Sequence, residues 1–317
     1  MKLNLLRRTL KKHRFIIITI FLALSGSIWL TFCVDRNCKD DIFGPEICDT
    51  DLVVDFLNVG KADCTVIYKN DLVILIDAGF TTPEGFVVRY LKDHVFSKRK
   101  LKNQIDLVVL THPHVDHYGQ MLDVFNNFKV KRFITSKSYV GKSDIREYRN
   151  LLNKIKSKNV KIEIAKANNT FKINDVFIKI LGPLSQHKKI NNNSVVLKII
   201  FKNIKFLFTG DAEREEENEL IRFGQNLNSD IIKIGHHGSK TSTSWQFLKA
   251  VKAKYAVISA GDHFNLSNLF PSKVVTKRLN QAGIKYFITK DIGTIRIAVS
   301  KDGTLKVPSS KEILKAA

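Results

Sequence analysis

The sequence is poor in the residues that stabilise small disulfide-rich or zinc-containing folds. Its 317 residues include four cysteines, six prolines and two tryptophans. No cysteines form a CxxC pair or a zinc-finger spacing, which argues against a structural zinc module. Cys38 and Cys48 are close enough along the chain to pair in an oxidising compartment, whereas both would stay free thiols in a reducing one. No internal repeat is detectable, which argues against a repeat array.

Acidic residues are scarce relative to basic ones. The chain has 52 Lys and Arg against 30 Asp and Glu, a formal charge of +22, and six of the positive charges lie in the first fourteen residues. Such an excess favours polyanionic partners such as nucleic acid, teichoic acid or anionic lipid. It is equally compatible with the Lys-, Asn- and Ile-rich composition of an AT-rich genome, in which case it reports no ligand.

Long apolar runs are also rare, with one clear example. Residues 15–34 carry no charge, and as a helix they would extend about 30 Å, the thickness of a bilayer core. We therefore predict a basic cytoplasmic tail at residues 1–14 and a single transmembrane anchor at residues 15–34, with the rest of the chain outside the cell membrane. The small residues at 25–27 leave open a cleaved signal peptide and a secreted product. The lack of a second such run argues against a polytopic transporter.

Beyond the apolar run, residues 35–51 are predicted to be a linker, residues 52–300 one α/β domain, and residues 301–317 a C-terminal tail. Short apolar runs alternate with helical patterns throughout the domain, which predicts two sheets packed face to face with helices outside. Predicted strands cover residues 52–57, 64–68, 73–76, 107–110, 132–134, 160–164, 176–181, 195–201, 204–208, 231–234, 255–259, 286–289 and 294–299. Predicted helices cover residues 86–94, 121–127, 148–157, 213–223, 245–249 and 274–282.

The most specific motif is LVVLTHPHVDHYG at residues 107–119. An apolar strand ends at Thr111 and is followed by His112, His114, Asp116 and His117, which form an HxHxDH pattern. Three imidazoles and one carboxylate at this spacing supply the nitrogen and oxygen ligands that zinc, manganese and iron accept. A polar loop without a metal would place the same residues after a buried strand at considerable cost. The motif therefore predicts a metal centre.

Two later strand ends offer further ligands. FLFTGD places Asp211 after the strand at 204–208, and IIKIGHHGS places His236 and His237 after the strand at 231–234. Gly235 and Gly238 allow a tight bend there. Each motif alone is an ordinary turn, but together with HxHxDH they indicate a shared metal cluster.

These motifs, in this order, resemble the metallo-β-lactamase superfamily, and in particular the ComEC-like branch of DNA-uptake and competence proteins. The similarity extends over residues 52–299 and includes VDFLNVGKADCTVI, LVILIDAG with Asp77, NNNSVVL with Asn193 and Ser194, and GTIRI. The resemblance implies an αββα four-layer sandwich and a metal-dependent hydrolase. It implies two divalent ions, zinc or manganese.

The resemblance also assigns roles to the motif residues. His112 and His114 would hold one ion, Asp211 would bridge, and the other ion would be held by Asp116, His117 and His237. Asp116 is expected to orient the attacking water and take its proton, and His236 to act in catalysis or face the substrate. Residues expected to support the ligands or touch the substrate are Asp77, Asn193, Ser194 and Ser239. We expect His187, in a polar loop, to be solvated and not a ligand.

The sequence departs from the branch near the predicted substrate site. Asn58, Lys61 and Ala62 replace the usual Asp, Gln and Gly of the first turn, and Phe270 replaces a His before Pro271. An imidazole that would contact phosphate or act in catalysis is therefore missing, and we predict that His263 takes its place in space.

Because metal ligands alone do not select a substrate, the substrate prediction depends on charge and on the resemblance. Both favour a phosphodiesterase or nuclease acting on extracellular DNA, with Lys61, Lys240 and Lys273 as phosphate contacts. Three alternatives remain open: a cell-surface phosphorylcholine-type esterase, a lactam or lactone hydrolase, and a non-catalytic metal-containing binding protein. The sequence gives no indication of the oligomeric state.

Overall fold

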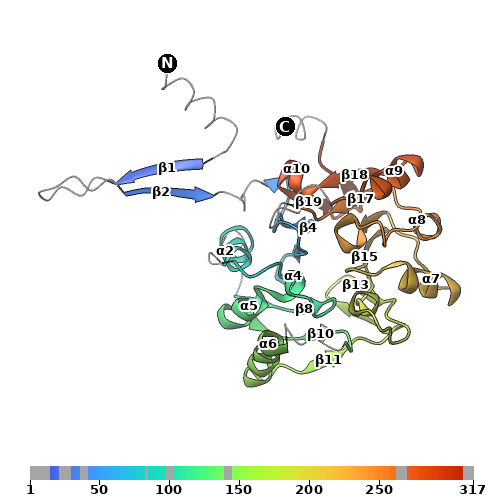
Figure 1. The fold of residues 1–317 in the computed structure, drawn as a ribbon, viewed down its shortest axis with the longest axis horizontal. Helices are drawn as coiled ribbons and strands as arrows, with labels where there is room; N and C mark the ends of the chain where they lie inside the picture. Colours follow the sequence, from blue (N-terminus) through green and yellow to red (C-terminus); the bar gives the residue numbers. More distant parts are fainter. Residues whose placement is uncertain are drawn as a thin grey trace, which may run out of the picture. The chain divides into compact units, whose positions relative to one another are not determined.

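The computed structural model describes residues 15–20, 30–35, 42–82, 85–97, 103–138, 145–261 and 270–309. The chain divides into two units, Met1–Lys39 and Asp40–Ala317. In the first unit, β1 (Phe15–Ile20) and β2 (Leu30–Asp35) pair as antiparallel strands (Figure 1), with Phe15 opposite Asp35.

The predicted membrane anchor is wrong, and so is the single-pass membrane location that depended on it. Both ends of the 15–34 segment are strands. Within the described parts of the chain, no helix has the length and apolar character needed to cross a bilayer. The segment FIIITI is rich in β-branched residues, which lose side-chain freedom in a helix and fit a strand well. Hydrophobicity alone therefore suggested the wrong secondary structure. The basic tail at 1–14 lies outside the described residues.

The first sheet of the larger unit has the strand order β11, β10, β8, β6, β5, β4, β19, β20, with β3 beside β19. The strands β6, β8, β10 and β11 are parallel, and β4, β5 and β19 continue the sheet in antiparallel pairs. β3 falls within the predicted linker and β20 within the predicted tail, so the sheet extends beyond residues 52–300. The bounds are β3 (Ile42–Phe43), β4 (Leu52–Phe56), β5 (Thr65–Lys69), β6 (Leu72–Ile76), β8 (Leu107–Leu110), β10 (Phe133–Thr135), β11 (Ile162–Ile164), β19 (Thr294–Val299) and β20 (Leu305–Lys306).

The second sheet follows the chain order from β12 to β18. Its first strands, β12 to β15, form antiparallel pairs, and β15 to β18 are parallel. A separate short pair joins β7 (Gln104–Ile105) to β9 (Lys129–Val130). The bounds in the second sheet are β12 (Thr170–Ile173), β13 (Val176–Ile180), β14 (Leu197–Phe201), β15 (Ile204–Phe208), β16 (Ile231–Lys233), β17 (Tyr255–Ile258) and β18 (Lys285–Ile288).

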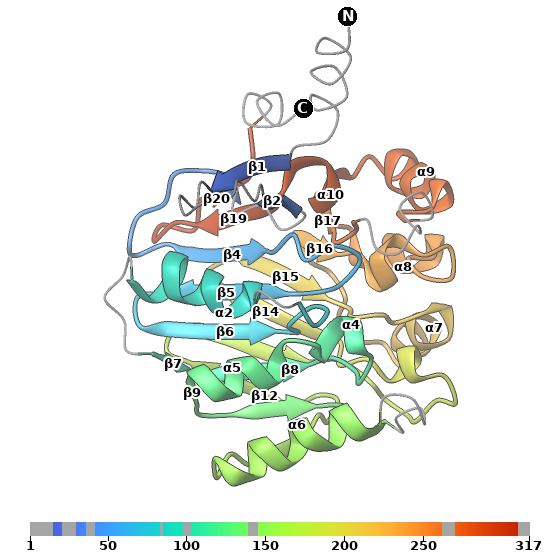
Figure 2. The ribbon, with the colours of Figure 1, turned by 60° about the vertical axis from the view of Figure 1, so that its left-hand side comes forward.

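Helices cover the outer faces of both sheets (Figure 1, Figure 2). On one side lie α2 (Phe86–Tyr90), which continues as a π-helical turn (Leu91–Phe96), α5 (Met121–Asn127) and α6 (Ile145–Ser157). On the other side, α7 (Arg214–Arg222), α8 (Trp245–Val251) and α9 (Lys273–Gln281) pack through Leu220, Phe247 and Leu279 onto the second sheet. Two further short helices are α4 (Val115–Tyr118) and α10 (Thr289–Ile292). The predicted αββα four-layer sandwich is confirmed.

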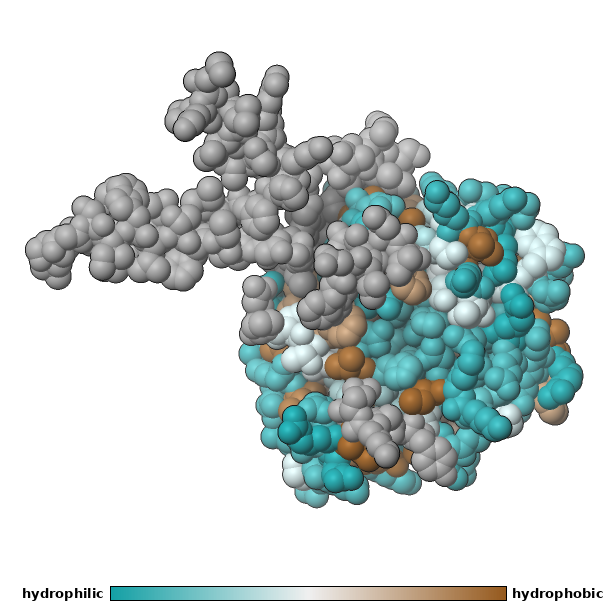
Figure 3. Space-filling model, in the orientation of Figure 1, coloured by the Kyte–Doolittle hydropathy of each residue, from teal (hydrophilic) through white to brown (hydrophobic). Residues whose placement is uncertain are grey.

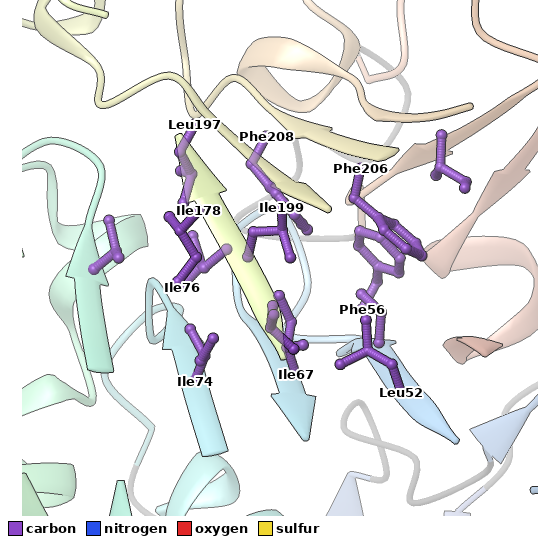
Figure 4. Close-up of a cluster of buried hydrophobic side chains, with 14 of the residues drawn as sticks. Leu52, Phe56, Ile67, Ile74, Ile76, Ile178, Leu197, Ile199, Phe206 and Phe208 are labelled. Atoms are coloured by element: carbon purple, nitrogen blue, oxygen red, sulfur yellow. The ribbon is translucent and has the colours of Figure 1, made fainter. Parts of the chain in front are cut away.

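The main core lies between the two sheets, where inward side chains of both interdigitate (Figure 4). Phe56 of β4 and Phe208 of β15 stack across the interface with ring centroids 6.0 Å apart. Burial of β4 and β6 is complete along their length because helices cover their other face, so these strands read as continuous apolar runs. The packing brings the C-terminal ends of parallel strands from both sheets to one edge of the sandwich.

One polar group interrupts the buried run of β4. Asp55 is fully buried and receives two hydrogen bonds from the Arg296 guanidinium, both at 2.7 Å. The hydroxyls of Tyr68 and Tyr90 also donate to Asp55. The cluster therefore joins β4 to β19, β5 and α2 through charge-assisted hydrogen bonds.

The described residues on the face drawn in Figure 3 are mostly hydrophilic, with apolar side chains scattered singly. Such scattered residues are normal for a protein surface.

Candidate metal centre

Loops that follow strands of both sheets meet at this edge. Asp77 follows β6, His112 follows β8, Asp211 follows β15 and His237 follows β16. Parallel strands place their C-terminal ends at the same edge of a sheet, and the packing of the sheets brings the two edges together. The structure therefore unites the three motifs that the sequence singled out.

The HxHxDH run is anchored where β8 ends. Asp77 accepts hydrogen bonds from the backbone N–H and from the hydroxyl of Thr111, each at 2.8 Å. The chain then turns into α4 with His114 as its extended N-cap residue. This turn brings Asp116 and His117 back toward the strand end.

Four side chains converge at the centre of the site. One ligand atom each from Asp116, His117, Asp211 and His237 lies within 4.8 Å of the others. Nε2 of His117 is 3.3 Å from Oδ1 of Asp211, and Nε2 of His237 is 3.3 Å from Oδ2 of Asp116. Oδ2 of Asp211 lies 3.7 Å from Nε2 of His237. This is the ligand set predicted for one ion together with the predicted bridging carboxylate.

The other two predicted ligands lie beside this group. Nε2 of His112 is 3.0 Å from Nδ1 of His114 and 3.9 Å from Oδ2 of Asp211. Burial, followed by the charge of His117, lowers the pKa of His112 well below its usual value. His112 is therefore neutral, which is the form that binds metals.

The donor atoms fit a bound cation. Nε2 of His117, Nε2 of His237 and Oδ1 of Asp211 are buried and make no hydrogen bond of acceptable geometry in the described part of the chain. Buried polar atoms are rarely left in this state, because each costs about 1–3 kcal/mol. A divalent ion would satisfy all three, and imidazole with carboxylate is a donor set that zinc and manganese accept.

The charges in the cluster favour added positive charge. Burial lowers the pKa of His117, but Asp211 and Asp77 outweigh burial and raise it well above the usual value. Burial also lowers the pKa of His237, but the negative charges of Asp211 and Asp63 outweigh burial and raise this pKa to about 9. Without a metal, protons on these histidines supply the positive charge. A divalent ion would replace the protons and supply that charge itself.

Comparison with known families agrees with this geometry. Residues 57–263 match the family model described as the metallo-beta-lactamase superfamily. The chain belongs to this superfamily. Membership supports a metal-dependent hydrolase in general terms.

The chain is also similar in sequence to two bacterial proteins, one of which is named as a competence protein. The chain is 30% identical over 257 residues to ComE operon protein 3 of Bacillus subtilis (strain 168), covering 77% of this chain and 32% of that protein. It is 35% identical over 122 residues to competence protein ComA of Neisseria gonorrhoeae, covering 38% and 17%. The chain thus spans about a third or less of the length of these relatives.

Among solved structures, the metallo-beta-lactamase fold protein YhfI from Bacillus subtilis superposes with a TM-score of 0.52 at 14% identity. The likeness covers 78% of this chain and 99% of YhfI. It shows the fold alone.

Two residues beside the metal centre, Asp63 and Lys233, were not predicted from the sequence. Nδ1 of His237 lies 3.1 Å from the carbonyl of Ser259 and 3.4 Å from Oδ1 of Asp63. Behind Asp63, the Lys233 ammonium lies 2.9 Å from the same Oδ1, and both side chains are almost fully buried. Asp63 also forms a group of possible ligands with Asp77 and His117. The signal was a lysine inside an apolar strand, because a buried lysine needs a partner.

The remaining predicted site residues fall into two groups. Ser194 contacts the cluster: its hydroxyl accepts a hydrogen bond from the Asp211 N–H at 3.0 Å and lies 3.4 Å from Nδ1 of His112. Asn193 uses its side chain to hold the backbone of residues 187–189. Ser239 lies within 2.9 Å of the Thr241 hydroxyl. Asn193 and Ser239 therefore stabilise loops around the centre.

His236 lies at the rim of the centre and is partly exposed. Nε2 of His236 is 3.7 Å from Oδ2 of Asp211, and its Nδ1 is 3.4 Å from Glu213 and from Thr241. Asn191 approaches the same ring at 3.4 Å. These contacts fix the ring in an orientation that faces both the cluster and the solvent.

The residues predicted to contact substrate around the metal centre differ in their surroundings. Lys61 lies over the Phe270 ring, 4.5 Å from its centroid, while Lys240 and Lys273 are exposed. His263, predicted to replace the missing imidazole, lies outside the described residues. The expectation that His187 is solvated is wrong.

The side chain of His187 is only 7% exposed, and two glutamates of α7 lie against its ring. Its Nε2 is 3.1 Å from Glu219 and its Nδ1 is 3.4 Å from Glu215. The imidazole thus holds the loop against α7, and its two nitrogens face different carboxylates.

Proposed function

We propose that this chain is a metal-dependent phosphodiesterase that acts on DNA. The observation that carries the proposal is the convergence of Asp116, His117, Asp211 and His237, whose ligand atoms lie within 4.8 Å of one another at the edge where strand ends of both sheets meet. Competence proteins among the relatives and the formal charge of +22 both favour a nucleic-acid substrate.

The ions would be held by the six residues His112, His114, Asp116, His117, Asp211 and His237. A divalent ion bound there lowers the pKa of a water and stabilises the negative charge that develops on a phosphoryl group. Asp116, whose side chain is 15% exposed, is the carboxylate that a water can reach, and it would orient the water and accept its proton. His236 would donate a hydrogen bond to the leaving oxygen, because its rim position lets it face both the cluster and a ligand.

Basic residues near His236 support a polyanionic substrate. An open hollow of about 610 Å³ is lined in part by Lys189, Arg214 and Lys240. Glu213 and Thr241, which contact the His236 ring, line the same hollow. Phosphates on either side of the one at the centre would lie along Arg214 and Lys240, because the Lys189 ammonium lies 2.8 Å from the Glu213 carboxylate.

The first test is hydrolysis by the full chain, stripped of metal and then loaded with manganese or zinc. Substrates are single-stranded DNA, duplex DNA and bis-nitrophenyl phosphate. We expect metal-dependent DNA hydrolysis, with about 10²- to 10⁴-fold loss in Asp116→Asn. Asp123→Asn, at a partly exposed position in the first turn of α5, is the matched control and should retain the wild-type rate.

Two outcomes would contradict the proposal. Hydrolysis of small phosphodiesters or esters without hydrolysis of DNA would indicate a small-ester hydrolase. Full metal loading without turnover of any substrate would indicate a binding protein.

A second test concerns the predicted phosphate contacts. A triple change of Lys61, Lys240 and Lys273 to Glu should weaken DNA binding and spare hydrolysis of a small ester. For each phosphate that the protein neutralises, the affinity of the wild type for single-stranded DNA should fall by about 0.7 log units per tenfold rise in salt concentration. Equal loss on DNA and ester would instead indicate misfolding of the variant, which circular dichroism would reveal.

A further inference from the structure

An aromatic ring lies at the rim of the metal centre and has no role in the proposed chemistry. The Phe270 ring is 6.3 Å from the His236 ring and 6.5 Å from the His237 ring, centroid to centroid. It meets the His237 ring nearly at a right angle. The Lys61 ammonium lies over the ring at 4.5 Å, and the side chain is partly exposed.

The ring is firmly placed. Pro271 packs against Gly238, so that a Cβ atom at Gly238 would lie 2.6 Å from Cβ of Pro271. The Ser272 N–H donates to the Gly238 carbonyl at 2.9 Å. Phe270 is thus fixed to the same loop that carries His236 and His237, and its inner edge packs on the core beneath α8 and α9.

Lys61 is held on the opposite side by an equally close backbone contact. A Cβ atom at Gly261, in the loop after β17, would lie 2.5 Å from Cα of Gly60. Only glycine permits this approach. The contact fixes the turn before Lys61 against the second sheet, so that the ammonium and the aromatic ring face each other at the mouth of the centre.

We propose that Phe270 is a stacking platform for the nucleobase adjacent to the phosphate at the metal centre, with Lys61 as its phosphate partner. This inference rests on the proposed function. Every base has a planar apolar face, so stacking on an aromatic side chain accepts any sequence. A base that enters displaces the ammonium from the ring and leaves it free for the neighbouring phosphate, and Lys61 and Phe270 thereby exchange one cation–π contact for two contacts with the substrate.

Binding without hydrolysis separates this role from catalysis. With EDTA present, the full chain is titrated with a labelled deoxythymidine decamer and with a decamer of abasic residues that has the same backbone charge. Stacking of one base contributes roughly 1–3 kcal/mol, so the wild type should prefer the decamer with bases by about 5- to 150-fold. Fluorescence anisotropy at low salt measures both affinities.

The decisive variant is Phe270→Leu, which keeps an apolar side chain against the core and removes the aromatic face. The preference for bases should fall to near one, while Phe270→Trp should restore it. Phe223→Leu is the matched control: Phe223 is 60% exposed and has the Arg222 guanidinium 5.0 Å from its centroid. It should keep the wild-type preference. Metal content of each variant, measured by elemental analysis, confirms that the centre is intact.

Lys61→Met tests the second half of the inference. The preference for bases should persist or rise, because the ring face is uncovered, while the salt slope of binding should fall by about 0.7.

The outcomes distinguish the inference from the proposed function. Equal preference in the wild type and in Phe270→Leu, or a wild-type preference near one, would overturn the stacking role while leaving the phosphodiesterase proposal intact. No binding of either decamer, together with no hydrolysis of DNA, would overturn both.

Discussion

Replacing Lys233 by Met should weaken the metal centre although Lys233 does not belong to the ligand set. The Lys233 ammonium donates to the Ile234 carbonyl at 2.9 Å and lies 2.9 Å from Oδ1 of Asp63. The same carboxylate oxygen lies 3.4 Å from Nδ1 of His237. Lys233 therefore acts on His237 through Asp63, as a positioning residue.

The size of the effect follows from burial. The side chains of Lys233 and Asp63 are 3% and 6% exposed, so the variant leaves a carboxylate that water cannot reach. Removing one partner of a buried ion pair costs about 3–5 kcal/mol. Loss of a group that orients a metal-binding histidine lowers metal affinity by about 10- to 100-fold. We expect both effects in Lys233→Met, the first in the metal-free chain and the second on titration with metal.

The assay combines urea unfolding of the metal-free chain with calorimetric titration of zinc or manganese. The matched control is Lys198→Met. Lys198 is another buried lysine of the second sheet, but its ammonium donates to the carbonyls of Asn226 and Asn228. Its removal therefore leaves no buried carboxylate without a partner. It should lower stability without changing metal affinity.

A Lys233→Met chain that binds metal with wild-type affinity would refute the positioning role. A double variant, Lys233→Met with Asp63→Asn, gives an independent check. The neutral amide at position 63 carries no charge that needs a partner, so the double variant should regain part of the lost stability. If it is less stable than the single variant, the ion-pair reasoning is wrong.

Three further predictions concern other parts of the fold. Asp211→Asn should lower the bound metal from close to two ions to below one, measured by elemental analysis, because the amide cannot balance two divalent charges. Burial raises the pKa of Glu216 well above the usual 4.5; the native state therefore holds a proton that the unfolded state has released, and the contribution of Glu216 to stability falls as pH rises above 4.5. The stability advantage of Glu216→Gln in urea should accordingly grow toward neutral pH, and parallel pH profiles would contradict this. Arg296→Met should cost about 3–5 kcal/mol by leaving Asp55 buried and unpaired, whereas Lys131→Met, whose side chain is 52% exposed, should cost at most about 1 kcal/mol in the same thermal unfolding assay.

The sequence predicted well those elements whose apolar pattern is decided locally. The strands at 107–110 and 204–208 and the helix at 121–127 have the predicted bounds. β12 (Thr170–Ile173) was missed because its residues alternate between exposed and half-buried, which gives no apolar face to read. The apolar segment at 15–34 was misread because length and hydrophobicity do not distinguish a spanning helix from two apolar strands.

In the site too, the sequence predicts groups of residues that are close in the chain and misses partners that are distant in it. The HxHxDH residues could be recognised because they are neighbours in the chain. Lys233 and Asp63 are separated by most of the domain and become partners only when β16 packs beside the first turn. His187 looked solvated because its neighbours in sequence are polar, whereas its partners Glu215 and Glu219 come from a later helix.

The division of the candidate ligands between the two sheets has a consequence for the order of assembly. A growing chain has the HxHxDH run long before Asp211 and His237 have been synthesised, so an ion captured early would meet an incomplete set of donors. The complete set exists only after the second sheet has closed on the first. A bound ion would therefore be held only by a chain in which β15 and β16 already lie against the β6 and β8 part of the first sheet, and it would join the two sheets at their shared edge.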